Sequence, residues 1–314
     1  MSQTCAGNLV LLIATTSGIS LLLCPTPALA QATSASLSGA VQDSSGAMVA
    51  KAKVLAKAIA TNQEREITTD SEGNYILTNL PVGPYEVTVS APGFRTEVSG
   101  GVILQVGQRA RLDFTLVAGK VMETVNVTAQ VPVVNTEDST FGDVIENKRV
   151  VELPLNGRNF NTLALLTPNV QNGIPGGATL QNFLAGGIAI WAHGNRDTDN
   201  EWNLDGATMN VGFYNWNSFN PSVDAIQEFK IQTGAFPAEF GFQAGANVNI
   251  VTKSGTNAVH GTLFNFLRND KMDARGFFPA SKPKLRQNQF GGTVGGPVYI
   301  PKIYNGKDRT FFFS

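Results

Sequence analysis

The residue types that most often carry chemistry are sparse in this chain. It has two histidines, His193 and His260, and neither has a neighbouring acid or thiol that would complete a zinc-binding pattern. The sequence also has no G-x-S-x-G nucleophile elbow and no G-x-x-x-x-G-K-[ST] phosphate-binding loop. We therefore predict no catalytic residues, no metal site and no cofactor, and we do not expect an enzyme.

One acidic turn offers oxygen ligands. Asp70, Glu72 and Asn74 alternate along the chain, and three such acceptors could bind calcium. A solvated hairpin loop explains the same spacing without a metal, and we favour that interpretation.

A second group combines aromatic and polar side chains in a stretch rich in Gly and Asn. Such side chains could line a loop that faces a ligand. Packing within the core or the loops is the commoner explanation, and both alternatives stay open. The group consists of Trp191, His193, Arg196, Trp202, Tyr214 and Trp216.

The composition limits the elements that position these side chains. At roughly 150 residues per domain, 314 residues make about two domains with room for a third small element. The formal net charge of -1 provides no basic field for nucleic acid. Only 15% of the residues are charged and 32 are glycine, which argues against a helical bundle and favours a β-rich, turn-rich exported protein.

Residues 1–30 predict a secretory signal peptide. An apolar run over residues 9–23 precedes an A-x-A signal at residues 28–30, which predicts cleavage after Ala30. The alternative, a membrane helix, needs roughly 20 apolar residues, and this run is shorter. No basic residue precedes the run, and a misassigned start codon would explain this departure.

Both cysteines of the chain fall inside the predicted signal peptide. Cys5 and Cys24 would be removed with it, so we expect no disulfide and no cysteine metal site in the mature chain. A lipid anchor on Cys24 is an alternative, but the bulky Leu23 before it argues against one.

Residues 34–119 predict a small β-sandwich. Short runs alternate between apolar and polar residues, as in Tyr85-Glu86-Val87-Thr88-Val89, and Gly, Asp and Ser separate them. About seven such runs fit two packed antiparallel sheets. The Ala-rich residues 49–61 lie between these runs, so we predict a strand there rather than a helix.

Four segments of this unit match a known family, at residues 39–43, 69–75, 80–85 and 91–94. They resemble the carboxypeptidase regulatory-like domain, which implies a transthyretin-like, Ig-like sandwich of the carbohydrate-binding-like type. Because such sandwiches serve many purposes, the resemblance implies the fold and leaves the function open.

Residues 121–257 form a second predicted unit of mixed α and β elements. A short extended segment comes first, made of Glu123, Thr124, Val125, Asn126, Val127, Thr128 and Ala129, and residues 130–139 are typical of a linker. We predict two short helices. The first contains Val144, Ile145, Val150 and Val151, and the second contains Phe160, Leu163 and Leu166. Gly- and Asn-rich loops follow, and alternation over residues 247–252 predicts a strand.

Segments 152–160, 203–206, 238–241 and 248–257 together resemble, in this order, the plug domain of TonB-dependent outer-membrane receptors of the Oar-like group. In that family the periplasmic TonB protein binds a segment before the plug by β-strand addition. This segment is called the TonB box, and residues 123–129 match it in position and in residue pattern. The alternative is that they only end the sandwich as a linker.

Residues 261–314 predict the start of a transmembrane β-barrel. Phe264 and Phe266 alternate with other residues in a first strand, and Phe290 and Val294 share one face of a second. A long polar loop between them is expected outside the cell. Asn305-Gly306 predicts a turn before a third strand. Open sheet edges are costly in hydrocarbon, so we expect this chain to be the N-terminal portion of a longer receptor.

These resemblances imply an outer-membrane receptor that takes up an unidentified small molecule, oligosaccharide or peptide. Its partners would be a TonB-type energy-transducing protein and the lipid of the outer membrane. The alternative is a secreted or surface adhesion protein that binds carbohydrate or protein. That alternative leaves the order of the plug segments and the amphipathic strands unexplained.

Overall fold

The computed structural model describes residues 34–119, 124–127, 140–153, 155–173, 190–211, 216–217, 219–236, 243–277 and 281–314. The chain divides into the units Met1–Ala30 and Gln31–Ser314, and every described residue belongs to the second. The predicted signal peptide and linker lie outside these ranges. No helix within them combines the length and the apolar character that a membrane crossing needs.

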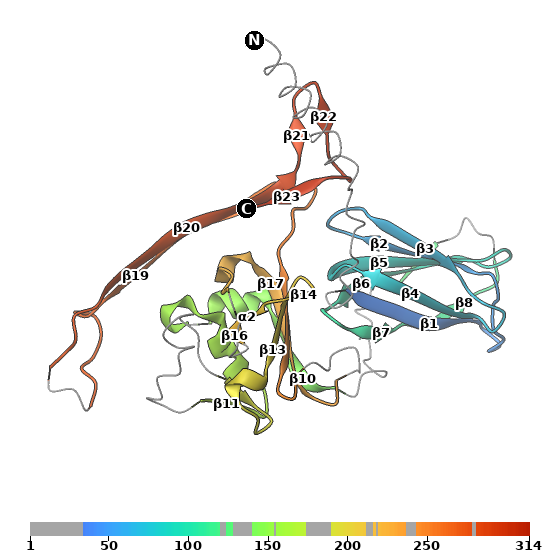
Figure 1. The fold of residues 1–314 in the computed structure, drawn as a ribbon. Coiled ribbons are helices and arrows are strands. Elements are labelled where there is room, and N and C mark those ends of the chain that lie inside the picture. The colour runs from blue at the N-terminus through green and yellow to red at the C-terminus, as the bar shows by residue number, and fades with distance from the viewer. Residues whose placement is uncertain are drawn as a thin grey trace, which may run out of the picture. The chain divides into compact units, whose positions relative to one another are not determined.

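The predicted β-sandwich is confirmed. One sheet has the order β4–β1–β7, with β8 also paired to β1, and the other has the order β3–β2–β5–β6–β9 (Figure 1). The strands are β1 (Ala35–Asp43), β2 (Lys53–Ala58), β3 (Glu64–Thr68), β4 (Asn74–Leu80), β5 (Gly83–Ser90), β6 (Thr96–Leu104), β7 (Arg109–Arg111), β8 (Phe114–Leu116) and β9 (Thr124–Val127). The Ala-rich run forms strand β2, as its position between strands predicts.

The alternation of residues decides which side chains fill the sandwich. On β5, Tyr85, Val87 and Val89 are buried while Glu86 between them is exposed. This pattern follows from the two-residue period of a strand, which turns every second side chain to the same face. The acidic turn joins β3 of one sheet to β4 of the other rather than forming a hairpin, and the Asp70 carboxylate accepts hydrogen bonds from the backbone N–H groups of Glu72 and Asn74.

The plug is built on a five-stranded sheet of order β10–β17–β18–β13–β14. Its strands and helices are β10 (Phe141–Glu146), α2 (Asn147–Glu152), η1 (Asn156–Arg158), η2 (Phe160–Leu166), β11 (Val170–Asn172), β12 (Ile190–Ala192), η3 (Asp197–Asp199), β13 (Glu201–Leu204), β14 (Ala207–Thr208), β15 (Asn210–Val211), β16 (Trp216–Asn217), η4 (Val223–Ala225), β17 (Ile226–Gly234) and β18 (Asn247–Thr252). The expected strand at residues 247–252 is present as β18.

One helix prediction is wrong in part. Val144 and Ile145 lie in strand β10, which pairs with β17, and only Val150 and Val151 lie in the helix α2. The other expected helix is the 3-10 helix η2. Its Phe160 ring packs edge to face against the Phe229 ring of β17, with the two ring centroids 5.6 Å apart. This contact fixes η2 on the apolar face of the sheet.

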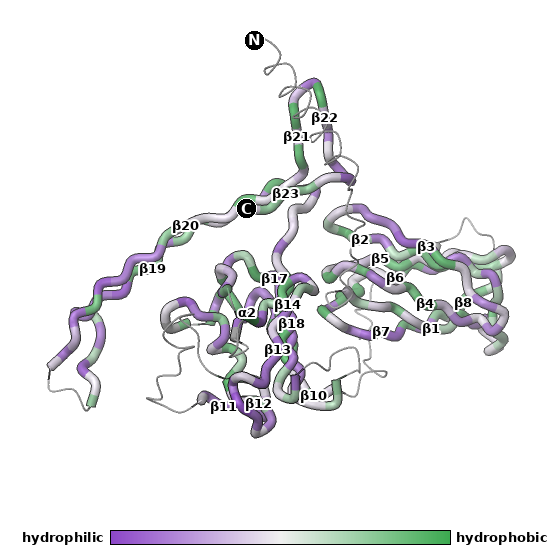
Figure 2. The backbone as a smooth tube through the Cα atoms, in the orientation of Figure 1, coloured by the Kyte–Doolittle hydropathy of each residue, from purple (hydrophilic) through white to green (hydrophobic). Residues whose placement is uncertain are grey.

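The last part of the chain is a long antiparallel pair with a third strand beside it. β19 (His260–Asn269) pairs with β20 (Arg286–Pro297), which pairs with β23 (Phe311–Phe313). Hydrophobic residues recur along β19 and β20 between hydrophilic ones (Figure 2). A small hairpin of β21 (Tyr299–Ile300) and β22 (Tyr304–Asn305) precedes the turn at Gly306, where Arg309 N–H donates to the Gly306 carbonyl.

The two faces of this strand pair differ. Leu263 is 94% exposed and Phe290 is 77% exposed on one face, and Leu267 and Val294 share that face. Phe264 lies on the other face, where its ring covers Gly291 of the neighbouring strand. The sheet therefore presents an outward apolar face, as expected for strands that meet lipid.

Candidate functional site

The TonB box-like segment forms a strand on the edge of the sandwich. Residues Thr124–Val127 make β9, which runs parallel to β6 with Thr96 opposite Thr124 and Ser99 opposite Val127. Glu123, Thr128 and Ala129 lie outside the described residues. The backbone of this segment therefore continues the ladder of a folded sheet, which fits a TonB box and a segment that only ends the sandwich equally.

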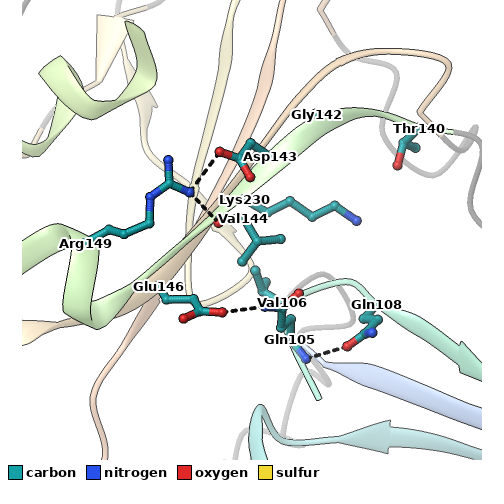
Figure 3. A pocket seen from close by; sticks show the side chains of 10 residues that line it. All are labelled: Gln105, Val106, Gln108, Thr140, Gly142, Asp143, Val144, Glu146, Arg149 and Lys230. Carbon is teal, nitrogen blue, oxygen red and sulfur yellow. Dashed lines mark hydrogen bonds and ion pairs between the residues drawn. The ribbon is translucent and has the colours of Figure 1, made fainter. Parts of the chain in front are cut away.

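A loop of the sandwich contacts the plug sheet. The backbone N–H of Val106 donates to the carboxylate of Glu228 on β17, and the Lys230 Nζ donates to the Gly107 carbonyl at 3.2 Å. The Gln105 amide donates to the Glu146 carboxylate at 3.0 Å (Figure 3). These contacts border a polar cavity of about 600 Å³, and one of its walls carries the Asp143–Arg149 ion pair at 3.0 Å.

Burial perturbs one carboxyl group at this contact. Glu228 is 7% exposed, and this burial raises the pKa of its carboxyl group to about 7. The hydrogen bond from Val106 opposes the rise in pKa, and the negative charge of Glu146 adds to it. The protonation state of Glu228 therefore changes near neutral pH, where the sandwich loop and the plug meet.

A second charged group joins the plug to the barrel strands. Arg158 lies in segment 152–160, which resembles the plug family, and it forms an ion pair with Asp224 of η4. The side chains of Arg158 and Asp224 are 14% and 8% exposed. The Arg158 Cζ also lies 3.9 Å from the Phe266 ring centroid and 4.7 Å from that of Phe264. The guanidinium group therefore sits between a carboxylate and two aromatic rings, a favourable place for a planar cation.

The structure does not bring the aromatic and polar group together as one surface. Trp191 and His193 line a small cavity of about 310 Å³ near Asn169 and Gln171. Arg196 instead begins η3, where its backbone N–H donates to the Asp199 carboxylate. Trp202 is buried in the plug core. Tyr214 and the side chain of Trp216 lie outside the described residues.

Sequence reasoning missed Glu228 and Lys230. They alternate with Phe229 and Ile231 along β17, a pattern that by itself indicates a solvent-facing polar side. Their burial depends on the sandwich loop at residues 105–108, which comes from more than one hundred positions earlier in the chain. No local signal marks that contact.

Two family models match the ends of the described chain. The carboxypeptidase regulatory-like domain matches residues 36–117, and the outer membrane beta barrel domain matches residues 251–314. These two matches cover the sandwich and the barrel strands, so the two ends of the chain are similar to parts found in outer-membrane proteins.

One relative is the TonB-dependent transporter Oar of Myxococcus xanthus. It is 27% identical over 267 residues, which are 80% of this chain and 23% of the relative. The chain is therefore homologous to Oar and spans less than a quarter of its length.

Solved structures resemble parts of the chain. The siderophore receptor PirA from Acinetobacter baumannii covers 50% of this chain and 22% of its own, at 22% identity and a TM-score of 0.37. A carbohydrate binding protein from Bacteroides uniformis, named as such only provisionally, covers 27% of this chain and 42% of its own, at 15% identity and a TM-score of 0.24. Hydroxyquinol 1,2-dioxygenase from Pseudomonas putida covers 28% of this chain and 57% of its own, at 12% identity and a TM-score of 0.24.

Proposed function

We propose that this chain is the N-terminal part of a TonB-dependent outer-membrane receptor that takes up an unidentified ligand. The observation that carries the proposal is the homology to the TonB-dependent transporter Oar, which extends over 80% of the chain. That stretch is long enough to include the sandwich, the plug and the first barrel strands in one order.

The proposed mechanism assigns each part a task. Outer loops and the plug capture the ligand, and a periplasmic TonB-type protein binds residues 123–129 by strand addition. The partner transmits energy from the inner-membrane proton gradient, and the plug rearranges so that the ligand passes. This work needs no catalytic side chain and no cofactor in the chain, so we propose a transporter rather than an enzyme.

The test deletes residues 123–129 in the complete receptor. Growth on a panel of iron chelates, vitamins, oligosaccharides and peptides first identifies a nutrient whose use requires the receptor. We expect the deletion to abolish energised uptake of that labelled nutrient while binding at the cell surface remains.

A matched control deletes residues 130–136, which shortens the same region by seven residues and spares the box-like segment. We expect the control to retain uptake. Full uptake in the variant that lacks residues 123–129 would contradict the assignment of this segment.

A further inference from the structure

Strand β9 is the last strand of its sheet. The order is β3–β2–β5–β6–β9, and within the described ranges no strand pairs with the outer edge of β9. In a parallel ladder, successive residues direct their backbone N–H and C=O groups alternately to the two sides. Half of the backbone groups of β9 therefore point to β6, and the other half point to its outer edge.

The inner neighbour of β9 is firmly held. β6 pairs with β5 along its length, with Val89 opposite Glu97 and Gly83 opposite Leu104. Val102 and Leu104 of β6 are buried in the sandwich core. β6 thus belongs to a packed sheet, and a segment paired to it is kept extended by that sheet.

An extended segment with one open edge suits strand addition. Unpaired edge groups recruit a further strand, and the main-chain hydrogen bonds provide the affinity. A free peptide must lose conformational entropy before it pairs, whereas a segment already ordered on β6 has lost it beforehand. The sandwich would therefore favour the binding of a partner strand.

We infer that strand β6 presents residues Thr124–Val127 as a preformed strand, and that a TonB-type protein adds its strand to the outer edge of β9 while β9 stays paired with β6. This inference rests on the proposed function, in which residues 123–129 are the segment that the partner binds. In the opposing arrangement the sandwich would compete with the partner, and β9 would have to leave β6.

The experiment locks β9 to β6 with a disulfide in the complete receptor. Val98 and Asn126 are opposite each other in the ladder, so Val98→Cys with Asn126→Cys places two thiols on neighbouring strands. Strands in a sheet lie about 4.8 Å apart, within the roughly 4.4–6.8 Å between Cα atoms that a disulfide allows. Cysteines occur in this sequence only at Cys5 and Cys24, before the predicted cleavage point.

A matched control joins two strands of the same sheet away from β9. Lys53→Cys with Thr68→Cys links register partners on β2 and β3. The probe is the purified periplasmic domain of the TonB protein from the same organism, and its affinity is measured with oxidised and reduced receptor in detergent. We expect the oxidised Val98–Asn126 pair to bind within about twofold of the reduced form and of the control, because the outer edge of β9 stays open.

Three outcomes would overturn the inference. A loss of affinity of tenfold or more on oxidation, restored by reductant and absent in the control, would show that β9 must leave β6. Failure of this pair and of a second pair, Thr96→Cys with Thr124→Cys, to form a crosslink would show that β9 is not held in this register. Undiminished binding of the TonB domain to the receptor that lacks residues 123–129 would contradict the proposed function as well. This last outcome therefore separates a failure of the proposed function from a failure of the inference alone.

Discussion

Glu228 and Lys230 are the two charged side chains that β17 buries, and both contact backbone groups of one loop. A buried carboxylate is costly unless hydrogen bonds or opposite charges compensate it. Here Val106 supplies one N–H donor, and burial still raises the pKa of Glu228 to about 7. The contact between sandwich loop and plug is therefore sensitive to proton concentration.

The first prediction replaces Glu228 with Gln, which can still accept the hydrogen bond from Val106. The pKa of Glu228 rises from 4.5 to about 7 in the folded protein, so the folded state binds more protons between these values. The stability of the wild type should consequently fall as the pH rises from about 4.5 to 7, by up to roughly 3 kcal/mol. Glu228→Gln should lose this dependence and be the more stable protein at pH 8.

Urea titrations of the complete receptor at pH 5 and pH 8 measure this difference. Glu86→Gln, which changes an exposed carboxylate on β5, is the control and should keep the wild-type dependence on pH. An equal pH dependence in Glu228→Gln and the wild type would refute the argument.

The second prediction concerns the ion pair of Arg158 and Asp224. Removing one partner leaves a buried charge without compensation, which costs about 3–5 kcal/mol. Arg158→Met keeps an apolar stem near the aromatic rings but removes the charge, and Asp224→Asn removes the other charge. We expect the double variant to be little less stable than Arg158→Met alone, with a coupling energy of about 1–3 kcal/mol.

The half-exposed pair of Lys53 and Glu66, at 2.8 Å, is the matched control for this double-mutant cycle. Its coupling energy should stay below about 1 kcal/mol, because solvent screens it. Urea unfolding of the complete receptor provides both coupling energies. Equal coupling energies in the two pairs would contradict the argument that burial strengthens the Arg158–Asp224 ion pair.

At the scale of elements, the sandwich depends on a close approach between β1 and the chain just before β8. A Cβ atom on Gly39 would lie 1.9 Å from the Leu112 carbonyl oxygen, which also accepts a hydrogen bond from the Tyr75 hydroxyl at 2.7 Å. The Leu112 N–H in turn donates to the Ser38 carbonyl. The backbone groups of Leu112 thus connect β1 and β4 to the chain between β7 and β8, and only glycine at position 39 leaves them room.

The third prediction is that Gly39→Ala destabilises the sandwich by at least the roughly 1–3 kcal/mol of an overpacked core. Hydrogen exchange in the complete receptor should speed up in peptides from β1 and β8. Gly100→Ala on β6 is the control, because a Cβ there meets nothing within 4 Å. Equal protection of β1 in both variants would contradict the steric argument.

The elements also show how far the sequence could predict the fold. Strands such as β5 can be predicted from the alternation of apolar and polar residues, because one face of each strand is buried and the other faces solvent. Val144 and Ile145 looked helical together with Val150 and Val151, but the ladder to β17 decides their conformation, and β17 lies about eighty residues later. The pairing of β9 with β6 and the burial of Trp202 and Glu228 likewise depend on contacts between distant residues, which no local pattern records.

At the scale of the whole molecule, the strands β19 and β20 separate two environments. One face carries Leu263 and Phe290 and is exposed, while the other carries Phe266 against Arg158 of the plug. If the first face meets lipid and the second meets the plug, an arginine introduced on the first face should impair assembly in the membrane much more than an arginine at the adjacent position on the second face. Leu263 and Thr262 make that comparison possible within one strand.

The fourth prediction is that Leu263→Arg in the complete receptor lowers the amount recovered in the outer membrane. An arginine on the lipid face costs roughly 2–4 kcal/mol at the bilayer midplane and less near the interfaces. Thr262→Arg lies on the opposite face, where Thr262 and Thr293 hydroxyls are 2.8 Å apart, and losing that contact should cost far less. Fractionation and heat-modifiable electrophoresis measure the assembled receptor, and equal losses in the two variants would mean that the faces are assigned wrongly.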